Sequence, residues 1–370
     1  MTGFDGQRVY LDWNATAPLR PEARTAMLQA MDTVGNPSSV HAEGRAARKI
    51  VERARAQVAT LVGCQPDEVV FTSGATETTA WIAARLGGFL CPDSEHDCVV
   101  AHRDDGEDWE VDRNGRATLK PRAVDRSKVV ALGVANGETG VLQGAGELHA
   151  LRNEPGCRST VILRDAVQAI GKANYSIDGE YAFASAHKLG GPKGCGALLM
   201  REPLHPDPLF EGGGQEQGRR SGTENVIGIA GFGAAAEAAK RDLEAAVWEP
   251  VEKLRNILEE TLAAAAPETI FFGKESRRLP NTSCFAVPGW RGETQVMGLD
   301  LAGFAVSAGS ACSSGKVAKA SRVLRAMGFD EVTASSAIRV SIGPTTTEAE
   351  VMAFAHTWIE LHRRRRAQAA

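Results

Sequence analysis

The stretch that decides the fold reads FASAHKLGGPKGCGALLM, from Phe183 to Met200. An apolar run of small residues (181–186) ends at His187 and Lys188, a glycine-rich turn follows, and a second apolar run begins at Cys195. This order predicts a strand, a tight loop and a second strand. A lysine at the mouth of a buried strand is poorly hydrated, so its pKa falls toward the range in which a free amine attacks a carbonyl. Lys188 therefore has the setting of a Schiff-base lysine, although a surface lysine beside a glycine turn would give the same local pattern.

A second stretch, VILRDAVQAIG, places an acidic residue at the end of another apolar strand. Asp165 follows the run 161–163, and Gln168 comes three residues later. A carboxylate at a hydrophobic strand end is costly unless a cation meets it. The protonated ring nitrogen of pyridoxal phosphate is such a cation, and a lysine with an acidic partner is the usual protein contribution to that cofactor. The alternative is that Asp165 only caps the following helix.

A third stretch, VVFTSGATET (69–78), turns through Gly74 into a helix that should begin near Ala75. The backbone N–H groups of such a helix start, together with the hydroxyl groups of Ser73, Thr76 and Thr78, suit a dianionic phosphate. A glycine turn into a helix is common, so each stretch is weak evidence alone. The three together indicate a site for a phosphorylated pyridine cofactor.

The composition places the chain among ordinary globular proteins. Its 370 residues suffice for two hydrophobic cores, with 43% hydrophobic and 24% charged residues. The formal net charge of −4 gives no reason to expect nucleic acid as a partner. The seven cysteines form no CxxC pair and are odd in number, so neither a disulfide framework nor a metal site is expected. We see no signal peptide and no apolar run of ~18 residues, and therefore expect a cytoplasmic protein without a membrane partner.

Apolar runs that alternate with helical or loop segments predict a mostly parallel sheet covered on both faces. The expected strands are 69–72, 98–101, 129–134, 159–163, 181–186 and 195–200, after a short first strand at 9–11, with early helices at 21–34 and 39–62.

The C-terminal part predicts a second, smaller α/β unit. Some forty residues from Thr223 onward have a helical composition, interrupted by Pro250, which we take as the approximate junction. Thr347 and Glu350 have the spacing of a capping box and announce the last helix. Strands are expected between these points at 269–273, 281–287, 305–308 and 337–342.

Nearly end to end, the chain resembles the class V aminotransferase-like, fold-type-I pyridoxal-phosphate enzymes, and specifically the cysteine desulfurases. The motifs that carry the resemblance are YLDWNATAP (10–18), GNPSSVHAEGR (35–45), FTSGATET (71–78), SEHDCV (94–99), ANGETGVLQ (135–143), DAVQAIGK (165–172), SAHKLGGPKG (185–194), GGGQEQGRRSGTENV (212–226), SAGSACSSG (307–315) and SSAIRVSIG (335–343). The resemblance implies a large cofactor-binding domain (15–250) with a mostly parallel sheet of the seven-stranded type covered by helices. It also implies a smaller α/β domain (1–14 and 251–370) that carries a catalytic cysteine loop.

The resemblance assigns roles around the cofactor ring. Lys188 should bind the cofactor covalently, Asp165 should pair with the ring nitrogen, and Gln168 and Asn136 should hydrogen-bond the ring oxygen. His96 should stack on the ring and move protons.

Two of these assignments have alternatives within the sequence. Asn136 precedes a glycine, and Asn-Gly is a favoured turn pair in itself. His102 lies six residues after His96 and is its competitor.

The phosphate should be held by residues at the ends of two strands and by one residue of a second subunit. By resemblance these are Ala75, Thr76, Ser185, His187 and Thr223. Because the matching threonine of the family reaches the site of the other subunit, a homodimer with shared sites is expected.

The resemblance makes Cys312 the nucleophile. It lies in SAGSACSSGKVAKASR, a run of small residues that is typical of a mobile loop and not of a packed core. A thiol that attacks the sulfur of a bound cysteine, and then carries a persulfide to an acceptor, needs such mobility. Cys195 and Cys284 lie within apolar runs and are expected in the core.

Arg339, at a strand end, can pair bidentately with the α-carboxylate of an amino acid, and Asn14 matches a family residue near the same group. The implied reaction converts L-cysteine to L-alanine and leaves a persulfide on Cys312, which a protein sulfur acceptor then receives for iron–sulfur cluster assembly or other sulfur trafficking.

Several positions depart from the family pattern. They are 78–80 after TSGATE, Gly137 in place of a second asparagine, Arg164 in place of a histidine and Ala186 in place of a glycine. Two related reactions remain open, those of a selenocysteine lyase and of a cysteine sulfinate desulfinase, as does a non-catalytic relative that binds a partner or cofactor without turnover.

Overall fold

The computed structural model describes residues 8–104, 109–119, 129–144, 146, 148, 160–201, 206–309 and 320–369. Its main sheet has six strands in the described part of the chain, where a sheet of the seven-stranded type was expected. In spatial order they are β2 (Val69–Thr72), β9 (Gly196–Met200), β8 (Tyr181–Ser185), β7 (Val161–Asp165), β6 (Val129–Gly133) and β3 (Phe89–Leu90). The pairs β3/β6, β6/β7 and β7/β8 are parallel, whereas β8/β9 and β9/β2 are antiparallel. The expected mostly parallel α/β sheet is confirmed.

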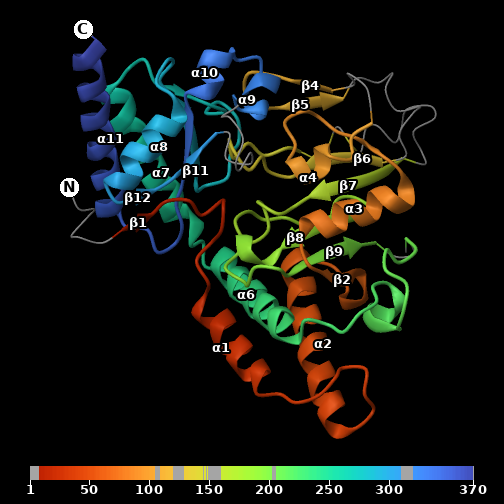
Figure 1. The fold of residues 1–370 in the computed structure, drawn as a ribbon. Helices are drawn as coiled ribbons and strands as arrows, with labels where there is room; N and C mark the ends of the chain where they lie inside the picture. The colour runs from red at the N-terminus through yellow and green to blue at the C-terminus, as the bar shows by residue number, and fades with distance from the viewer. Residues whose placement is uncertain are drawn as a thin grey trace.

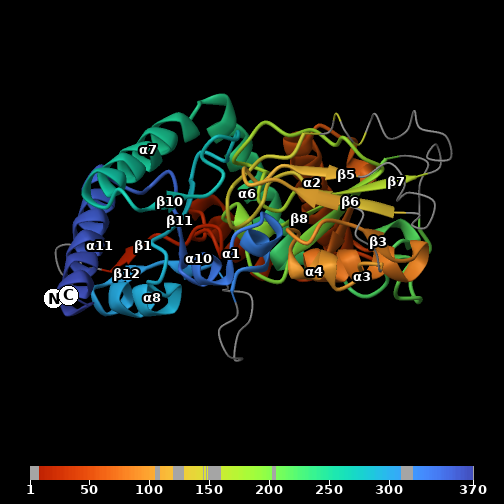
Figure 2. The ribbon, with the colours of Figure 1, turned by 90° about the horizontal axis from the view of Figure 1, so that it is seen from above.

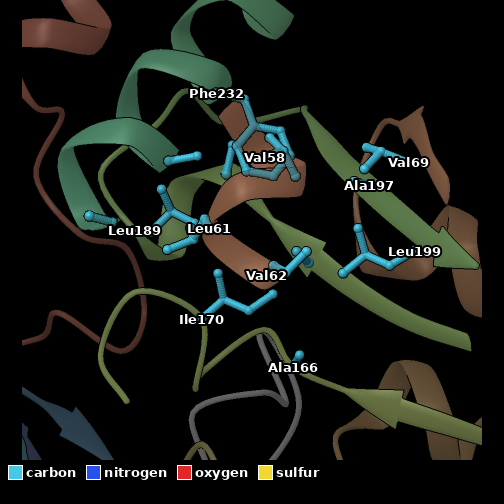
Figure 3. Packing of buried hydrophobic residues seen from close by; sticks show 14 of the residues in the cluster. Val58, Leu61, Val62, Val69, Ala166, Ile170, Leu189, Ala197, Leu199 and Phe232 are labelled. Carbon is cyan, nitrogen blue, oxygen red and sulfur yellow. The ribbon is translucent and has the colours of Figure 1, made fainter. Parts of the chain in front are cut away.

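Helices cover both faces of this sheet, as Figure 1 shows. One face carries α2 (Ala42–Val62) and α6 (Val226–Glu244), with α1 (Pro21–Met31) packed against α6, and the other carries α3 (Ala75–Leu86) and α4 (Asp97–Val100). The strands are buried on both sides because their alternate side chains enter different cores. In β2, Val69 and Phe71 join the core beneath α2 and α6, and Val70 joins the core beneath α3. Figure 3 shows the first of these cores, where Phe232 of α6 meets Val58 and Leu61 of α2.

The strand predicted at 98–101 is wrong, because this segment forms α4 and the strand lies earlier, at β3. His96 caps the helix: its Nδ1 accepts a hydrogen bond of 3.2 Å from the backbone N–H of Cys98. A four-residue apolar run has no periodicity that separates helix from strand, so the cap decides.

A second, four-stranded antiparallel sheet lies beside the first (Figure 1). It consists of β10 (Ile270–Phe271), β11 (Thr282–Ala286), β14 (Ala337–Ser341) and β13 (Ser307–Ala308). The N-terminal β1 (Val9–Tyr10) pairs in parallel with β12 (Phe304–Ala305). Further elements are α7 (Trp248–Ala265), α8 (Gly292–Leu301), α9 (Arg322–Ala326), α10 (Glu331–Ser335), α11 (Glu348–Ala369), and the hairpin β4 (Trp109–Val111) and β5 (Ala117–Leu119).

The second sheet has its own hydrophobic core, in which α7, α8 and α11 pack around β11 and β14 (Figure 2). Val9 and Leu11 from the start of the chain join this core. The domain limits at 14/15 and 250/251 stay a prediction.

The start of α11 and the break between α6 and α7 were both predicted from the sequence. The capping box before α11 is confirmed, since Thr347 Oγ1 accepts from Glu350 N–H at 3.2 Å and the Glu350 carboxylate accepts from Thr347 N–H at 2.7 Å. The break between α6 and α7 falls at 245–247, before Pro250. Pro250 lies in the first turn of α7, where a missing N–H costs nothing. No helix in the described ranges is long and apolar enough to cross a membrane.

Candidate active site

Lys188 lies directly after β8, at the end of a 3-10 turn formed by Ala186–Lys188. Its Nζ donates hydrogen bonds to the backbone oxygens of Asn14 at 2.6 Å and Ala15 at 3.0 Å. The following loop turns back at Gly190, whose φ of 89° lies in the left-handed region and whose missing Cβ would lie 2.5 Å from Arg20 Cγ. Only glycine fits there. The loop thus holds the lysine at the carboxyl end of a buried strand.

Asp165 ends the neighbouring strand β7, as the sequence predicts. Its Oδ1 accepts one hydrogen bond, of 2.9 Å, from the N–H of Val167. Burial raises the pKa of Asp165, while this hydrogen bond and the charges of His96, Lys188 and Arg164 act in the opposite direction. A carboxyl group in such a poorly hydrated position is stabilised as an anion by an added cation.

The two candidate histidines lie in different surroundings. His96 is exposed, caps α4 and is close enough for its charge to act on Asp165. His102 packs edge-on against Phe89, with ring centroids 5.7 Å apart. The two histidines thus differ in their surroundings, and the catalytic role of His96 stays a prediction.

The start of α3 meets the end of β8. The backbone N–H of Ala75 donates to Ser185 Oγ at 3.3 Å, and Thr76 is exposed in the first turn of the helix. Gly74 has a φ of 151°, and an added Cβ would lie 3.8 Å from Ser185 Oγ. N–H groups and hydroxyls thus gather where the sequence predicts the phosphate.

His187 and Thr223 complete the predicted phosphate set. His187 Nδ1 lies 3.1 Å from Thr16 Oγ1. Burial, with the charges of Lys188 and other lysines, lowers the pKa of His187 to about 4, so the ring is neutral at pH 7. Thr223 is exposed and lines, together with Ser73 at the end of β2, a pocket of about 170 Å³.

Gln168 and Asn14 belong to one buried cluster. Gln168 Nε2 donates to the backbone oxygen of Asn14 at 2.9 Å. The Asn14 side chain is fully buried, and its Nδ2 donates to Thr282 Oγ1 at 2.8 Å and to the Gly137 oxygen at 3.3 Å. Asn14 Oδ1 accepts from Asn281 Nδ2 at 3.0 Å. Because both N–H groups of Asn14 are engaged, its predicted contact with a substrate carboxylate would need one of these bonds to open.

Asn136 shapes its own turn. Its Oδ1 accepts from the N–H groups of Glu138 and Thr139, each at 2.9 Å, and its Nδ2 donates to the Ser94 oxygen at 2.9 Å. These contacts support the turn interpretation, and a contact with the ring oxygen stays a prediction.

Arg339, in β14, is held from two sides. Its Nη2 donates to Asp12 Oδ1 at 2.7 Å and to Ser307 Oγ at 3.2 Å, and its Nη1 donates to the Gly137 oxygen at 3.0 Å. Ser307 Oγ in turn donates to Asp12 Oδ2 at 2.7 Å. Arg339 Nε is buried without a hydrogen-bond partner among the described residues, so one N–H is left for a ligand.

Two of the cysteines were expected in the core, and the structure describes both. Cys195 and Cys284 are buried in the core, which confirms that prediction. Burial raises the pKa of Cys195 to about 12 and that of Cys284 further, so neither is a thiolate at neutral pH. Cys312 lies outside the described residues. Within the described ranges no cluster of three His, Cys, Asp or Glu side chains could hold a metal ion.

Two residues at this site, Asp12 and Lys172, were not predicted from the sequence. Asp12 fixes Arg339, 327 positions away in the chain. Lys172 Nζ donates to Gln168 Oε1 at 2.8 Å and to Asn14 Oδ1 at 3.1 Å. Both lie inside motifs quoted for the resemblance, and the four-residue spacing from Gln168 to Lys172 was the available signal.

These groups surround the carboxyl ends of β7 and β8, the usual place for a ligand in an open α/β sheet. A family model described as aminotransferase class-V matches residues 9–354. The chain belongs to this family.

Within the family, the chain belongs with the cysteine desulfurases. It is 41% identical to a cysteine desulfurase of Cereibacter sphaeroides, over 93% of each chain. It is 35% identical to an IscS-like cysteine desulfurase of Mycobacterium tuberculosis, over 92% of this chain and 93% of that one. A solved NifS-like protein from Rickettsia africae superposes with a TM-score of 0.87 at 30% identity, covering 96% of this chain and all of that one.

Proposed function

We propose that the protein is a pyridoxal-phosphate-dependent cysteine desulfurase that converts L-cysteine to L-alanine and transfers the sulfur to Cys312. The observation that carries the proposal is the meeting of Asp165, Lys188 and the start of α3 at one sheet edge. Asp165 is an acid in a poorly hydrated position that an added cation would stabilise, as the pyridinium nitrogen would. The N–H groups and hydroxyls around Ala75 and Ser185 offer donors to a phosphate. These residues fit the cofactor.

Each part of the chain then has a task. When bound, the cofactor supplies an electron sink that stabilises negative charge on the substrate Cα. Asp165 keeps the ring nitrogen protonated, and Lys188 holds the cofactor and takes up the Cα proton at its Nζ once released. Arg339 orients the substrate through its carboxylate.

Cys312 carries the sulfur. Its thiolate Sγ forms a bond with the substrate Sγ while the Cβ–Sγ bond breaks, and the electron pair of that bond stays with the carbon skeleton. Protonation of the skeleton yields alanine. The persulfide sulfur passes to a protein acceptor, which we place in iron–sulfur cluster assembly or related sulfur trafficking.

We also propose that the enzyme is a cytoplasmic homodimer in which Thr223 reaches the phosphate of the other subunit. The exposure of Thr223 beside Ser73 supports this assignment.

The test compares the wild type with Cys312→Ala and, as a matched control, Cys64→Ala, a half-exposed cysteine outside the site. We expect a yellow wild type that forms sulfide and alanine from L-cysteine. Cys312→Ala should keep the colour and lose turnover, and Cys64→Ala should keep both. A Cys312→Ala enzyme that remains fully active would instead identify a lyase of the selenocysteine or cysteine sulfinate type, and a colourless wild type would contradict the proposal altogether.

A further inference from the structure

Lys172 is a buried lysine at the centre of the site, with only 3% of its surface exposed. It ends the turn 167–172, which follows Asp165 at the end of β7. Its Nζ makes two hydrogen bonds, to Gln168 Oε1 at 2.8 Å and to Asn14 Oδ1 at 3.1 Å. Both acceptors are side-chain amide oxygens of residues that the family resemblance assigns to the site.

Burial lowers the pKa of Lys172 well below its usual range, and the charges of Lys188 and Arg339 lower it further. The two acceptors of Lys172 Nζ, Gln168 Oε1 and Asn14 Oδ1, hold the buried amine by hydrogen bonds.

The lysine is one of two groups that orient the Gln168 amide, the other being the Asn14 backbone oxygen. An amide has an accepting end and a donating end, and its hydrogen bonds determine the orientation. Because Oε1 is held by Lys172, the Nε2 end is directed to the Asn14 backbone oxygen, at 2.9 Å. That oxygen also accepts from Lys188 Nζ at 2.6 Å, so the Gln168 donor end lies beside the cofactor-binding lysine.

Gly137 has no side chain beside Gln168 Nε2. An added Cβ at this position would lie 3.4 Å from Gln168 Nε2. Nε2 has two N–H groups, and among the described residues only the Asn14 oxygen accepts from it, so the second N–H is left for a ligand atom.

We propose that Lys172 is a positioning residue, which fixes the amide of Gln168 so that an N–H group points at the oxygen substituent of the cofactor ring, and which fixes the amide of Asn14 beside it. The inference rests on the proposed function, because the cofactor is the ligand that this N–H serves. In this role Lys172 acts through the two amides that it contacts.

The test measures binding of pyridoxal phosphate to the apoprotein of the wild type, Lys172→Met, Gln168→Ala and the double variant, by absorbance titration. Methionine keeps the unbranched apolar stem but has no N–H donor, so Gln168 Oε1 loses its partner and the amide is anchored only through the bond of Nε2 to the Asn14 oxygen. We expect Lys172→Met to weaken cofactor binding by about tenfold, as for a lost buried hydrogen bond, and to shift the visible absorbance of the bound cofactor. If Lys172 acts through Gln168, the effects of the two substitutions on the dissociation constant are not additive.

Ile170→Val is the matched control. Ile170 is buried in the same turn, between Gln168 and Lys172, and packs into the hydrophobic core of Figure 3. This substitution lowers stability by about 1 kcal/mol without touching a hydrogen bond of the cluster, so cofactor affinity and spectrum should stay within twofold of wild type. Lys253→Met, at an exposed position, is the control for replacing a lysine by methionine, and it should also leave cofactor affinity and spectrum unchanged.

The outcomes separate the two proposals. A yellow wild type whose Lys172→Met variant binds the cofactor with unchanged affinity and spectrum overturns the role of Lys172 and leaves the proposed function intact. Additive effects in the double variant also overturn it. A wild type that binds no pyridoxal phosphate overturns the proposed function, and this inference with it.

Discussion

Arg339 illustrates how a single residue of this site is prepared for its ligand. Asp12 and Ser307 hold one side of the guanidinium, so the side chain needs little further ordering when a carboxylate arrives. Its buried Nε has no partner among the described residues. Such an N–H is stabilised when a substrate carboxylate accepts from it.

We therefore predict that Arg339→Lys raises the KM for L-cysteine by about 10- to 100-fold, with a smaller change in kcat, because the compact ammonium of lysine cannot keep the contacts of the guanidinium with Asp12 and Ser307 and also donate at the position of Nε. Steady-state kinetics checks this. Arg291→Lys, at the exposed N-cap of α8, should leave KM unchanged. An unchanged KM in Arg339→Lys would remove Arg339 from the substrate site.

Glu95 is a second residue with a measurable consequence. Burial raises its pKa to about 7, and the neighbouring Asp165 adds to this, while a hydrogen bond from Gly133 N–H opposes it. A raised folded-state pKa means that the fold favours the protonated form. The stabilising contribution is then complete below the ordinary glutamate pKa of about 4.3 and is lost as the pH rises through about 7.

Glu95→Gln removes this pH-dependent loss of stability, because glutamine does not ionise and its amide oxygen can still accept from Gly133 N–H. We predict that the variant becomes more stable than the wild type by roughly 2–3 kcal/mol above pH 7, and that the difference shrinks toward pH 5. Urea unfolding across this pH range measures it. Glu260→Gln, on the exposed side of α7, should show no such pH-dependent difference. A constant difference at all pH values would assign the effect of Glu95→Gln to packing.

The sequence predicted the residues that end strands or start helices, such as Asp165 and Ala75, because strand and turn patterns place them at one sheet edge. It did not predict the partners that fix them. Asp12 reaches Arg339 and Lys172 reaches Asn14 through contacts between distant parts of the chain, and no local pattern encodes such a contact.

At the scale of the elements, the predicted helix and strand boundaries were wrong where a capping side chain, or a proline accepted in the first turn, determined where the element begins. The apolar run 98–101 is a helix because His96 caps it, and β3 has only two residues, too few for a pattern. Pro250 marked a break that lies three to five residues earlier, since a proline is accepted in the first turn of α7. Long segments such as α2 and β8, with clear burial patterns, were predicted well.

The α6–α7 break contains a strained residue. Ala246 is exposed and has a φ of 53°, in the left-handed region where a Cβ costs about 1 kcal/mol. Ala246→Gly should therefore raise the free energy of unfolding by about 0.5–1 kcal/mol.

Ala245 is the matched control, because it is the preceding exposed residue and has a φ of −87°. Ala245→Gly should lower the free energy of unfolding by a few tenths to 1 kcal/mol, since glycine adds only unfolded-state freedom there. Urea unfolding of both variants decides. Equal effects of the two substitutions would show that the conformation of Ala246 stores no strain.

At the scale of the whole molecule, the site connects residues of the first sheet region with residues of the second. Asn14, near the start of the chain, contacts Thr282 and Asn281 beside the second sheet and Gln168 and Lys172 beside the first. Motions that change the relative position of the two sheets therefore act on the residues that would hold cofactor and substrate.

In the proposed homodimer, the site would also include a residue of the second subunit, and mixing two variants tests this. If Thr223 serves the site of its partner, a dimer of one Lys188→Ala and one Thr223→Ala subunit has one intact site and one doubly altered site. When the two variants are unfolded and refolded together in equal amounts, about half of the dimers should be mixed. Because each mixed dimer has one intact site of two, the activity should exceed the mean of the separate variants by about a quarter of the wild-type activity. Size-exclusion chromatography establishes that the refolded sample is dimeric, and Thr223→Ser, which keeps the hydroxyl, should need no complementation. Activity equal to that mean in a dimeric mixture would place Thr223 in the site of its own subunit, next to Ser73, with which it shares a pocket.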